Sequence, residues 1–285
     1  MAVPCTVTAG QLSIRGLSLG GIETSLHCPQ LGVAFDCGHC PRSLVSTPRL
    51  FITHGHADHA AGLVPWLSLR LVYGFPEPLD VFAPEWLVPA LRTVVAAYES
   101  VQTFPYRVRF HALEAGSEVP LPGGRFVRAF RSPHVLPTMG YTVWERVTKL
   151  LPEFSSLPGA EIAARKRAGE ALFSSLDRPI LSFPGDTTIG VLDKQPHLYE
   201  SRVLLLEATY IDDKKDVAAC LQHGHVHLDQ VLERAEHFRN EHIVFTHFSQ
   251  SYTPREAEAI VRARTQGRFA PEIHAFVPSE DSWPG

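Results

Sequence analysis

Four side chains of the kinds that bind metal ions stand within six residues, directly after an apolar segment. Residues 50–53 have the composition of a buried strand, and the ordered set that follows is His54, His56, Asp58 and His59. His54 and His56 converge on one ion if the strand ends in a loop. Asp58 and His59 face a second ion if a helix begins near Asp58. A solvated loop explains any one of these residues but not the group, which therefore predicts a dinuclear metal site at a strand end.

Strand-like and helical segments alternate through most of the chain. Short β-branched runs predict strands at residues 33–36, 50–53, 107–111, 125–130, 179–183, 203–207 and 243–246. Helical periodicity predicts helices at residues 85–98, 161–172, 228–238 and 254–264. No long linker or internal repeat divides the 285 residues. We therefore expect one layered α/β or α+β domain that spans residues 1–285.

Composition places the chain among ordinary soluble proteins. The formal net charge is -4 and charged residues make up 20%, so any contact with nucleic acid must be a local patch. The first residues lack a basic segment followed by an apolar one, and no apolar run is long enough to span a membrane. The five cysteines are an odd number, and Cys37 and Cys40 have no second pair to complete a zinc knuckle. These features predict a cytoplasmic protein with free thiols in a loop or in the core.

A dinuclear site needs further ligands from elsewhere in the chain, including a carboxylate that bridges the two ions. Suitable residues each follow a predicted strand. They are His134 after residues 125–130, Asp186 after residues 179–183, and His247 after residues 243–246. Together with the first cluster, they complete two coordination spheres.

The order His-x-His-x-Asp-His, a lone His, Gly-Asp-Thr and a final His resembles the ligand set of the metallo-β-lactamase superfamily, and the match spans nearly the whole chain. The resemblance implies a four-layer αββα sandwich and two zinc ions per chain, with Mn²⁺ or Fe²⁺ as alternatives. One ion is then held by His54, His56 and His134; the other is held by Asp58, His59 and His247, with Asp186 bridging. Such a pair of ions lowers the pKa of a water between them, which Asp58 can orient or deprotonate.

Two further segments are similar to ribonuclease Z, the tRNA 3′-processing endonuclease of this superfamily. Leu206-Glu207-Ala208-Thr209-Tyr210 and Gly224-His225-Val226-His227 resemble a paired Glu and His of that family. The resemblance implies that Glu207 orients His225, and that His225 protonates the ribose 3′ oxygen as the phosphodiester breaks. His227 also fits a role as a helix cap. Segments 17–24, 34–38, 139–143 and 247–252 resemble the short, single-domain form of the family.

Two positions depart from the family pattern. The interval between His134 and Asp186 is short and lacks the Gly- and Pro-rich arm tip by which the bacterial type grips tRNA. It offers instead a short candidate substrate-gripping insertion at residues 145–178. The basic residues of this insertion are Arg146, Lys149, Arg165, Lys166 and Arg167. They either contact phosphate groups of the RNA or form a solvated helix face. Ser251 stands before Tyr252 where the family often has Arg, which removes one expected phosphate contact.

The resemblance implies an endoribonuclease that removes the 3′ trailer of precursor tRNA, acts as a homodimer and has no membrane partner. A small-molecule phosphodiesterase could use the same site, and only the nuclease would show a steep dependence on salt. A thioesterase or lactonase is a third reading, but it has no evident use for Glu207 and His225. A binding scaffold without catalysis would be expected to lack ligands, and every ligand position is filled.

Overall fold

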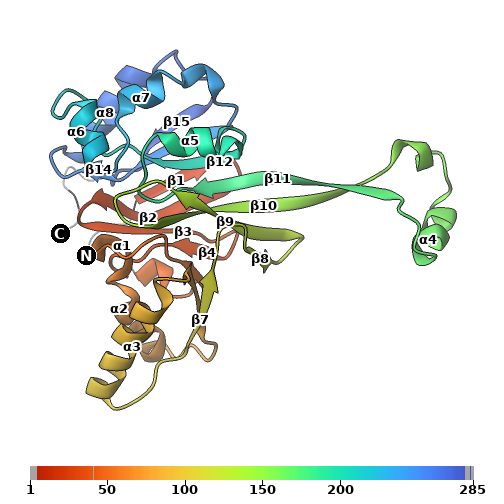
Figure 1. Ribbon diagram of the computed structural model, residues 1–285, viewed down its shortest axis with the longest axis horizontal. Helices are drawn as coiled ribbons and strands as arrows, with labels where there is room; N and C mark the ends of the chain where they lie inside the picture. Colours follow the sequence, from red (N-terminus) through yellow and green to blue (C-terminus); the bar gives the residue numbers. More distant parts are fainter. Residues whose placement is uncertain (1–4, 41, 280–282, 284–285) are drawn as a thin grey trace.

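Two β-sheets packed face to face form the centre of the molecule, and helices cover both outer faces (Figure 1). The computed structural model describes residues 5–40, 42–279 and 283. The first four residues, at the start of the segment in which no leader was expected, lie outside the described part. In the first sheet the strand order is β1 (Cys5–Ala9), β2 (Leu12–Gly20), β3 (Glu23–Cys28), β4 (Val33–Phe35), β5 (Arg49–Phe51), β6 (Leu79–Pro84) and β7 (Val108–Leu113), with β14 (Phe248–Ser249) paired to β2.

The second sheet has its parallel strands on one side and its antiparallel strands on the other. Its order is β15 (Glu272–Ala275), β13 (His242–Thr246), β12 (Val203–Glu207), β11 (Phe173–Phe183), β10 (Thr138–Leu150), β9 (Arg125–Ser132) and β8 (Glu118–Leu121). Strands β11, β12, β13 and β15 are parallel to one another. Their carboxyl ends therefore meet at one edge of the sheet, where loops can bring side chains together.

Three clusters of buried apolar residues stabilise the sandwich. One lies between the two sheets, and the other two lie between each sheet and the helices on its outer face. Phe35 and Phe51 of the first sheet meet Tyr141 of the second in the central layer. Outside the first sheet lie α1 (Ala57–Ala60), α2 (Leu63–Val72) and α3 (Val88–Gln102). Outside the second lie α5 (Gly190–Lys194), α6 (Val217–Gln222), α7 (Leu228–Leu232) and α8 (Pro254–Thr265). The predicted αββα sandwich is confirmed.

The predicted elements agree with the observed ones to different degrees. Each predicted strand is present, and most of their bounds shift by only a residue or two. The predicted helix 161–172 ends earlier, because α4 covers Gly159–Arg167. The predicted helix 228–238 is broken, because α7 ends at Leu232 and a 3-10 turn follows at Ala235–His237. The strands and α-helices that were not predicted are β1, β2, β3, β6, β8, β10, β14, β15, α2, α5 and α6.

A long two-stranded arm projects from the second sheet, in the interval where the sequence offered a short candidate insertion at residues 145–178 (Figure 1). β9 pairs with β10 only as far as Glu145, whereas β10 and β11 continue together to the pair Leu150 and Phe173. We call residues 146–177 the arm. Its tip contains a 3-10 turn at Pro152–Phe154 and helix α4. At about 3.4 Å per residue, the thirteen residues of β10 extend about 40 Å.

Two smaller expectations concern thiols and membranes. None of the five cysteines, all of which lie in the described part of the chain, forms a disulfide, as expected; Cys37 is buried and Cys40 half-buried. Within the described part of the chain, no helix combines the length and the apolar character needed to cross a bilayer.

Candidate metal centre

Loops at the strand ends carry the predicted ligands to one place between the two sheets. His54 and His56 precede α1, which begins at Ala57 and contains Asp58 and His59. His134 follows β9, and His247 follows β13 with a left-handed backbone, φ 59°. Asp186 follows β11 through Gly185, where φ is 70° and an added Cβ would stand 2.9 Å from the Thr53 side chain. Only glycine therefore fits the turn that delivers this aspartate.

The structure brings all of the predicted ligands together in two groups that share one carboxylate. The first group is His54, His56, His134 and Asp186; the second is Asp58, His59, His247 and Asp186. The two oxygens of Asp186 divide between the groups. Oδ1 lies 3.3 Å from Nε2 of both His59 and His247, and Oδ2 lies 3.9 Å from Nε2 of His54 and 4.0 Å from that of His134. This arrangement suits a carboxylate that bridges two cations.

Two properties of these side chains fit divalent cations: the distances between their ligand atoms, and ring nitrogens that lack a hydrogen-bond partner among the described residues. Nε2 of His59, His134 and His247 is buried and has no hydrogen-bond partner in the part of the chain that the structure describes, which is costly unless something else binds it. Zinc ligands about 2.0 to 2.1 Å from the ion stand about 3.3 Å apart at a tetrahedral edge. The 3.3 Å distances around Asp186 Oδ1 have that length. We call these two groups the metal centre.

Groups behind the histidines fix which ring nitrogen faces the metal centre. His59 donates from Nδ1 to Asp36 Oδ2 at 2.7 Å, and His134 donates from Nδ1 to the Gly224 carbonyl at 2.8 Å. Thr209 Oγ1 lies 3.0 Å from Nδ1 of His247. With the Nδ1 atoms engaged in this way, the Nε2 lone pairs point to the shared space. Second partners of this type commonly orient metal-binding histidines.

Asp36 is the carboxylate of this supporting set, and sequence reasoning assigned it no role. Its backbone adopts φ 57° at the end of β4, and its carboxylate is fully buried. It accepts hydrogen bonds from the Thr53 amide at 2.7 Å and from the Thr53 hydroxyl at 2.8 Å, in addition to His59. An aspartate directly after a buried strand was the available signal, and it was read only as part of a family pattern.

Burial and neighbouring charges favour an ionised Asp186 and a neutral His54, whereas Asp186 and Asp36 outweigh the effect of burial on His59 and raise its pKa well above the usual range. Burial by itself raises the pKa of Asp186, but His247 and His59 hold it well below its usual range. Burial lowers the pKa of His54 to about 2, and the neighbouring His59 adds to that effect. Deprotonated imidazole and carboxylate are the forms that bind metal ions.

Buried Glu207 and half-buried His225 form a hydrogen-bonded pair beside the metal centre. Glu207 Oε1 accepts from His225 Nδ1 at 2.9 Å, and the His225 ring centroid lies 5.2 Å from those of His134 and His247. Glu207 is held in turn by the Thr187 amide at 2.9 Å and the Thr209 hydroxyl at 2.7 Å. Burial by itself lowers the pKa of His225, but the Glu207 carboxylate more than offsets this and raises it to about 9. His227 caps α7 instead, as its alternative reading predicted.

A small pocket of about 250 Å³ opens beside His225 and His247, and a cation lines it. Lys215 contributes to its wall and lies over the Tyr210 ring. The neighbouring Lys214 donates to the Ser251 carbonyl at 2.8 Å and lies 4.2 Å from the Tyr252 ring centroid. Ser251, which stands where the family often has Arg, therefore has the cationic side chain of Lys214 next to it.

Comparisons with known proteins agree with this geometry. A family model described as "Beta-lactamase superfamily domain" matches residues 39–248. tRNase Z TRZ1 of Arabidopsis thaliana is 33% identical over 252 residues, which are 88% of this chain and 90% of that protein. The chain belongs to the tRNase Z family. Ribonuclease Z of Staphylococcus saprophyticus is 25% identical over 86% of this chain and 84% of its own length.

Solved structures extend the tRNase Z comparison to the whole fold. The short form of human tRNase Z, ELAC1, superposes with a TM-score of 0.56 at 19% identity and covers 99% of this chain and 95% of its own. The metallo-beta-lactamase fold protein YhfI of Bacillus subtilis gives a TM-score of 0.60 at 13% identity, covering 96% and 97%. At these identities the two likenesses establish the metallo-β-lactamase fold.

Proposed function

We propose that this chain is a metal-dependent endoribonuclease that removes the 3′ trailer of precursor tRNA. The observation that carries the proposal is the hydrogen-bonded pair of Glu207 and His225 in a chain 33% identical to a tRNase Z, with the His225 ring centroid 5.2 Å from those of two ligand histidines. Thioester or lactone hydrolysis has no evident use for this pair. Two Zn²⁺ ions are the proposed cofactors, with Mn²⁺ or Fe²⁺ as alternatives, and a cytoplasmic place of action remains a prediction.

The ligand residues would hold the ions while other groups handle protons. Bound divalent cations supply a Lewis acid and a water of lowered pKa. Asp58 Oδ2 is fixed by the Gly21 amide at 3.1 Å and lies 3.5 and 3.6 Å from Nε2 of His59 and His247. From this place it orients the attacking water or accepts its proton.

The departing ribose oxygen needs a proton from the other side of the phosphorus. Because Nδ1 of His225 is committed to Glu207, Nε2 is the ring nitrogen that delivers it. Glu207 stabilises the charged imidazolium and keeps the ring in one orientation. The cleaved tRNA is then left with a 3′ hydroxyl group.

The arm is the proposed RNA-binding surface, but some of its basic side chains already form ion pairs with acidic residues of the arm. Arg146 forms a two-bond ion pair with Asp177, and Arg165 forms one with Glu161. Lys149, Lys166 and Arg167 are exposed and, among the described residues, make no ion pair. We therefore assign phosphate contact to these three, on the outer part of the arm.

The first experiment measures cleavage of a 3′-extended precursor tRNA beside bis(p-nitrophenyl) phosphate, with zinc or manganese added. We expect one cut at the tRNA 3′ end and a steep fall in kcat/KM with salt. Replacing Lys149, Lys166 and Arg167 together with Gln should reduce the slope of log kcat/KM against log salt by about 2 to 3, since each lost phosphate contact removes about 0.7 to 0.9. Turnover of the small diester should not change.

A matched variant removes the same charge from the globular body, by replacing the exposed residues Lys194, Arg239 and Arg268 with Gln. Its salt slope should stay near that of the wild type. If wild type, the arm variant and this control have the same slope of log kcat/KM against log salt, the arm does not contact RNA phosphates. Turnover of the small diester without any cut in precursor tRNA would make the chain a small-molecule phosphodiesterase.

We also propose that two copies pair through the exposed apolar stripe of α3. Val94, Tyr98 and Val101 lie one helical turn apart and are 48%, 53% and 79% exposed, and Val72 of α2 adds a further apolar side chain, 79% exposed. Val101→Glu should convert a dimer to a monomer in sedimentation equilibrium, because a charge would be buried in the interface. A wild type that stays monomeric at micromolar concentration would contradict the pairing.

A further inference from the structure

Three metal-ligating side chains meet at the end of the second sheet that is remote from the metal centre. His242 begins β13, and Glu272 and His274 lie on the adjacent edge strand β15. The strands are parallel, and His242 pairs in register with Glu272 while Val244 pairs with His274. Alternate strand residues share a face, so all three side chains lie on the same face of the sheet. His242 stands about 16 Å from His247 along β13, too far to share its ligands.

The distances within this cluster are those of a coordination sphere. His242 Nδ1 lies 3.2 Å from His274 Nε2 and 3.3 Å from Glu272 Oε2. His274 Nε2 lies 3.8 Å from the other oxygen, Oε1, of Glu272. Ligands about 2.0 to 2.1 Å from a zinc ion stand about 3.3 Å apart at a tetrahedral edge. Two of the three edges match this length, and the third needs only a rotation of the glutamate.

The two imidazoles are partly buried and held in place, whereas the carboxylate is free to adjust. The side chains of His242 and His274 are 13% and 17% exposed, against 66% for Glu272. A Cβ added at Gly10, in the turn between β1 and β2, would lie 3.3 Å from His242 Nε2, so this turn packs closely on the ring. Ordering one exposed carboxylate side chain is then the main conformational cost of binding an ion.

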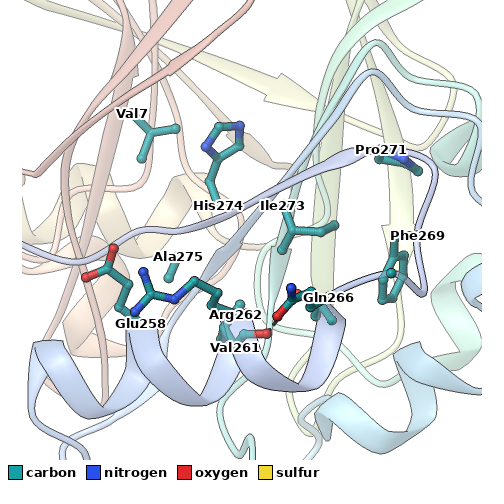
Figure 2. Close-up of a pocket in the computed structure, with 12 residues that line it drawn as sticks. Val7, Glu258, Val261, Arg262, Gln266, Phe269, Pro271, Ile273, His274 and Ala275 are labelled. Atoms are coloured by element: carbon teal, nitrogen blue, oxygen red, sulfur yellow. Dashed lines mark hydrogen bonds between the residues drawn. The ribbon is translucent and has the colours of Figure 1, made fainter.

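Solvent reaches the cluster on the side of Glu272, whose side chain is mostly exposed. His274 lines a groove of about 380 Å³ between β15 and α8, and Figure 2 shows its ring directed away from Arg262 and Glu258 of α8. Arg262 therefore does not stand against the ring nitrogens of His274 (Figure 2). A water can complete the fourth position on the solvent-exposed side.

We propose that His242, His274 and Glu272 form a second metal site, separate from the metal centre, that binds a divalent transition metal such as Zn²⁺. Two imidazoles and one carboxylate favour Zn²⁺, Cu²⁺ or Ni²⁺ over Mg²⁺ and Ca²⁺, which prefer oxygen ligands. The site joins the short edge strand β15 to β13. Because the ion binds only when the two strands are paired, it stabilises the folded chain and secures an edge strand that is otherwise held on one side.

The test compares zinc binding by the full chain and its variants. Wild type, His274→Gln and Glu272→Gln are stripped of metal with a chelator and dialysed against a series of free Zn²⁺ concentrations, and bound zinc per chain is measured. We expect wild type to bind one equivalent more than His274→Gln. Glu272→Gln should need at least roughly 10-fold more free zinc to fill this equivalent, the loss seen even when only a supporting group of a ligand is removed.

His237→Gln is the matched control, because it removes an exposed histidine of a nearby 3-10 turn outside the cluster. It should bind zinc as the wild type does. Glu272 is mostly exposed, so we expect its substitution to leave the fold intact. If His274→Gln does not fold, zinc binding by Glu272→Gln tests the proposal on its own. Identical binding curves for wild type, Glu272→Gln and His274→Gln would overturn the proposal and make the cluster a hydrogen-bonded surface group. A zinc-dependent rise in Tm that is smaller in both variants than in the wild type would support it independently.

Discussion

Asp186→Asn should abolish hydrolysis of both precursor tRNA and the small diester, with kcat/KM lower by at least roughly 10³-fold, about 4 kcal/mol. Each oxygen of Asp186 faces a different ligand group. An amide offers one oxygen and no charge, so the variant cannot bridge two cations. Metal bound at this centre should therefore fall together with activity, and metal analysis alongside the two assays measures this.

Asp193→Asn makes the same chemical change on an exposed aspartate of α5, whose side chain is 64% exposed. It should keep the metal content and both activities of the wild type. Full metal occupancy with full activity in Asp186→Asn would show that Asp186 does not bridge, and the assignment of the whole metal centre would then fail.

His225→Ala should keep its metal and yet cut precursor tRNA about 10² to 10⁴ times more slowly, the usual contribution of a positioned proton donor. The effect should depend on the leaving group. A ribose oxygen needs a proton as it departs, whereas p-nitrophenolate is stable without one, so turnover of the small diester should fall much less. Glu207→Gln should show the same selectivity, because it removes the charge that stabilises the imidazolium.

The ratio of the two losses separates a proton donor from a structural residue. A residue that merely supports the site would slow both substrates equally and would release metal. His237→Ala, which removes a histidine distant from the pocket, should leave both rates unchanged. Equal losses on the two substrates in His225→Ala would exclude the proposed role.

The sequence could indicate which side chains meet at the candidate metal centre because each of them follows a short buried strand. Such strands are recognisable as β-branched runs, and a His or Asp after one of them is conspicuous. The outer part of β10 was missed for the opposite reason. Its residues Arg146, Thr148 and Lys149 are exposed in the structure, so they have no apolar alternation, and the arm depends on pairing with β11.

Contacts between distant segments were also beyond sequence reasoning. The cluster of His242 and His274 depends on the parallel pairing of two strands whose histidines are thirty-two positions apart. The support that Gly224 gives to His134 joins residues ninety positions apart. No local pattern records either contact. The break after α7 is a similar case, since the helical periodicity continues through residues that leave the helix.

Strand β11 begins in the arm at Phe173 and ends at Phe183, and Asp186 of the metal centre follows three residues later. Paired strands change length very little, so the tip and the metal centre are kept a fixed distance apart. If the arm holds the substrate as proposed, the bond that is cut would be set by its distance from the gripped part rather than by the bases around it.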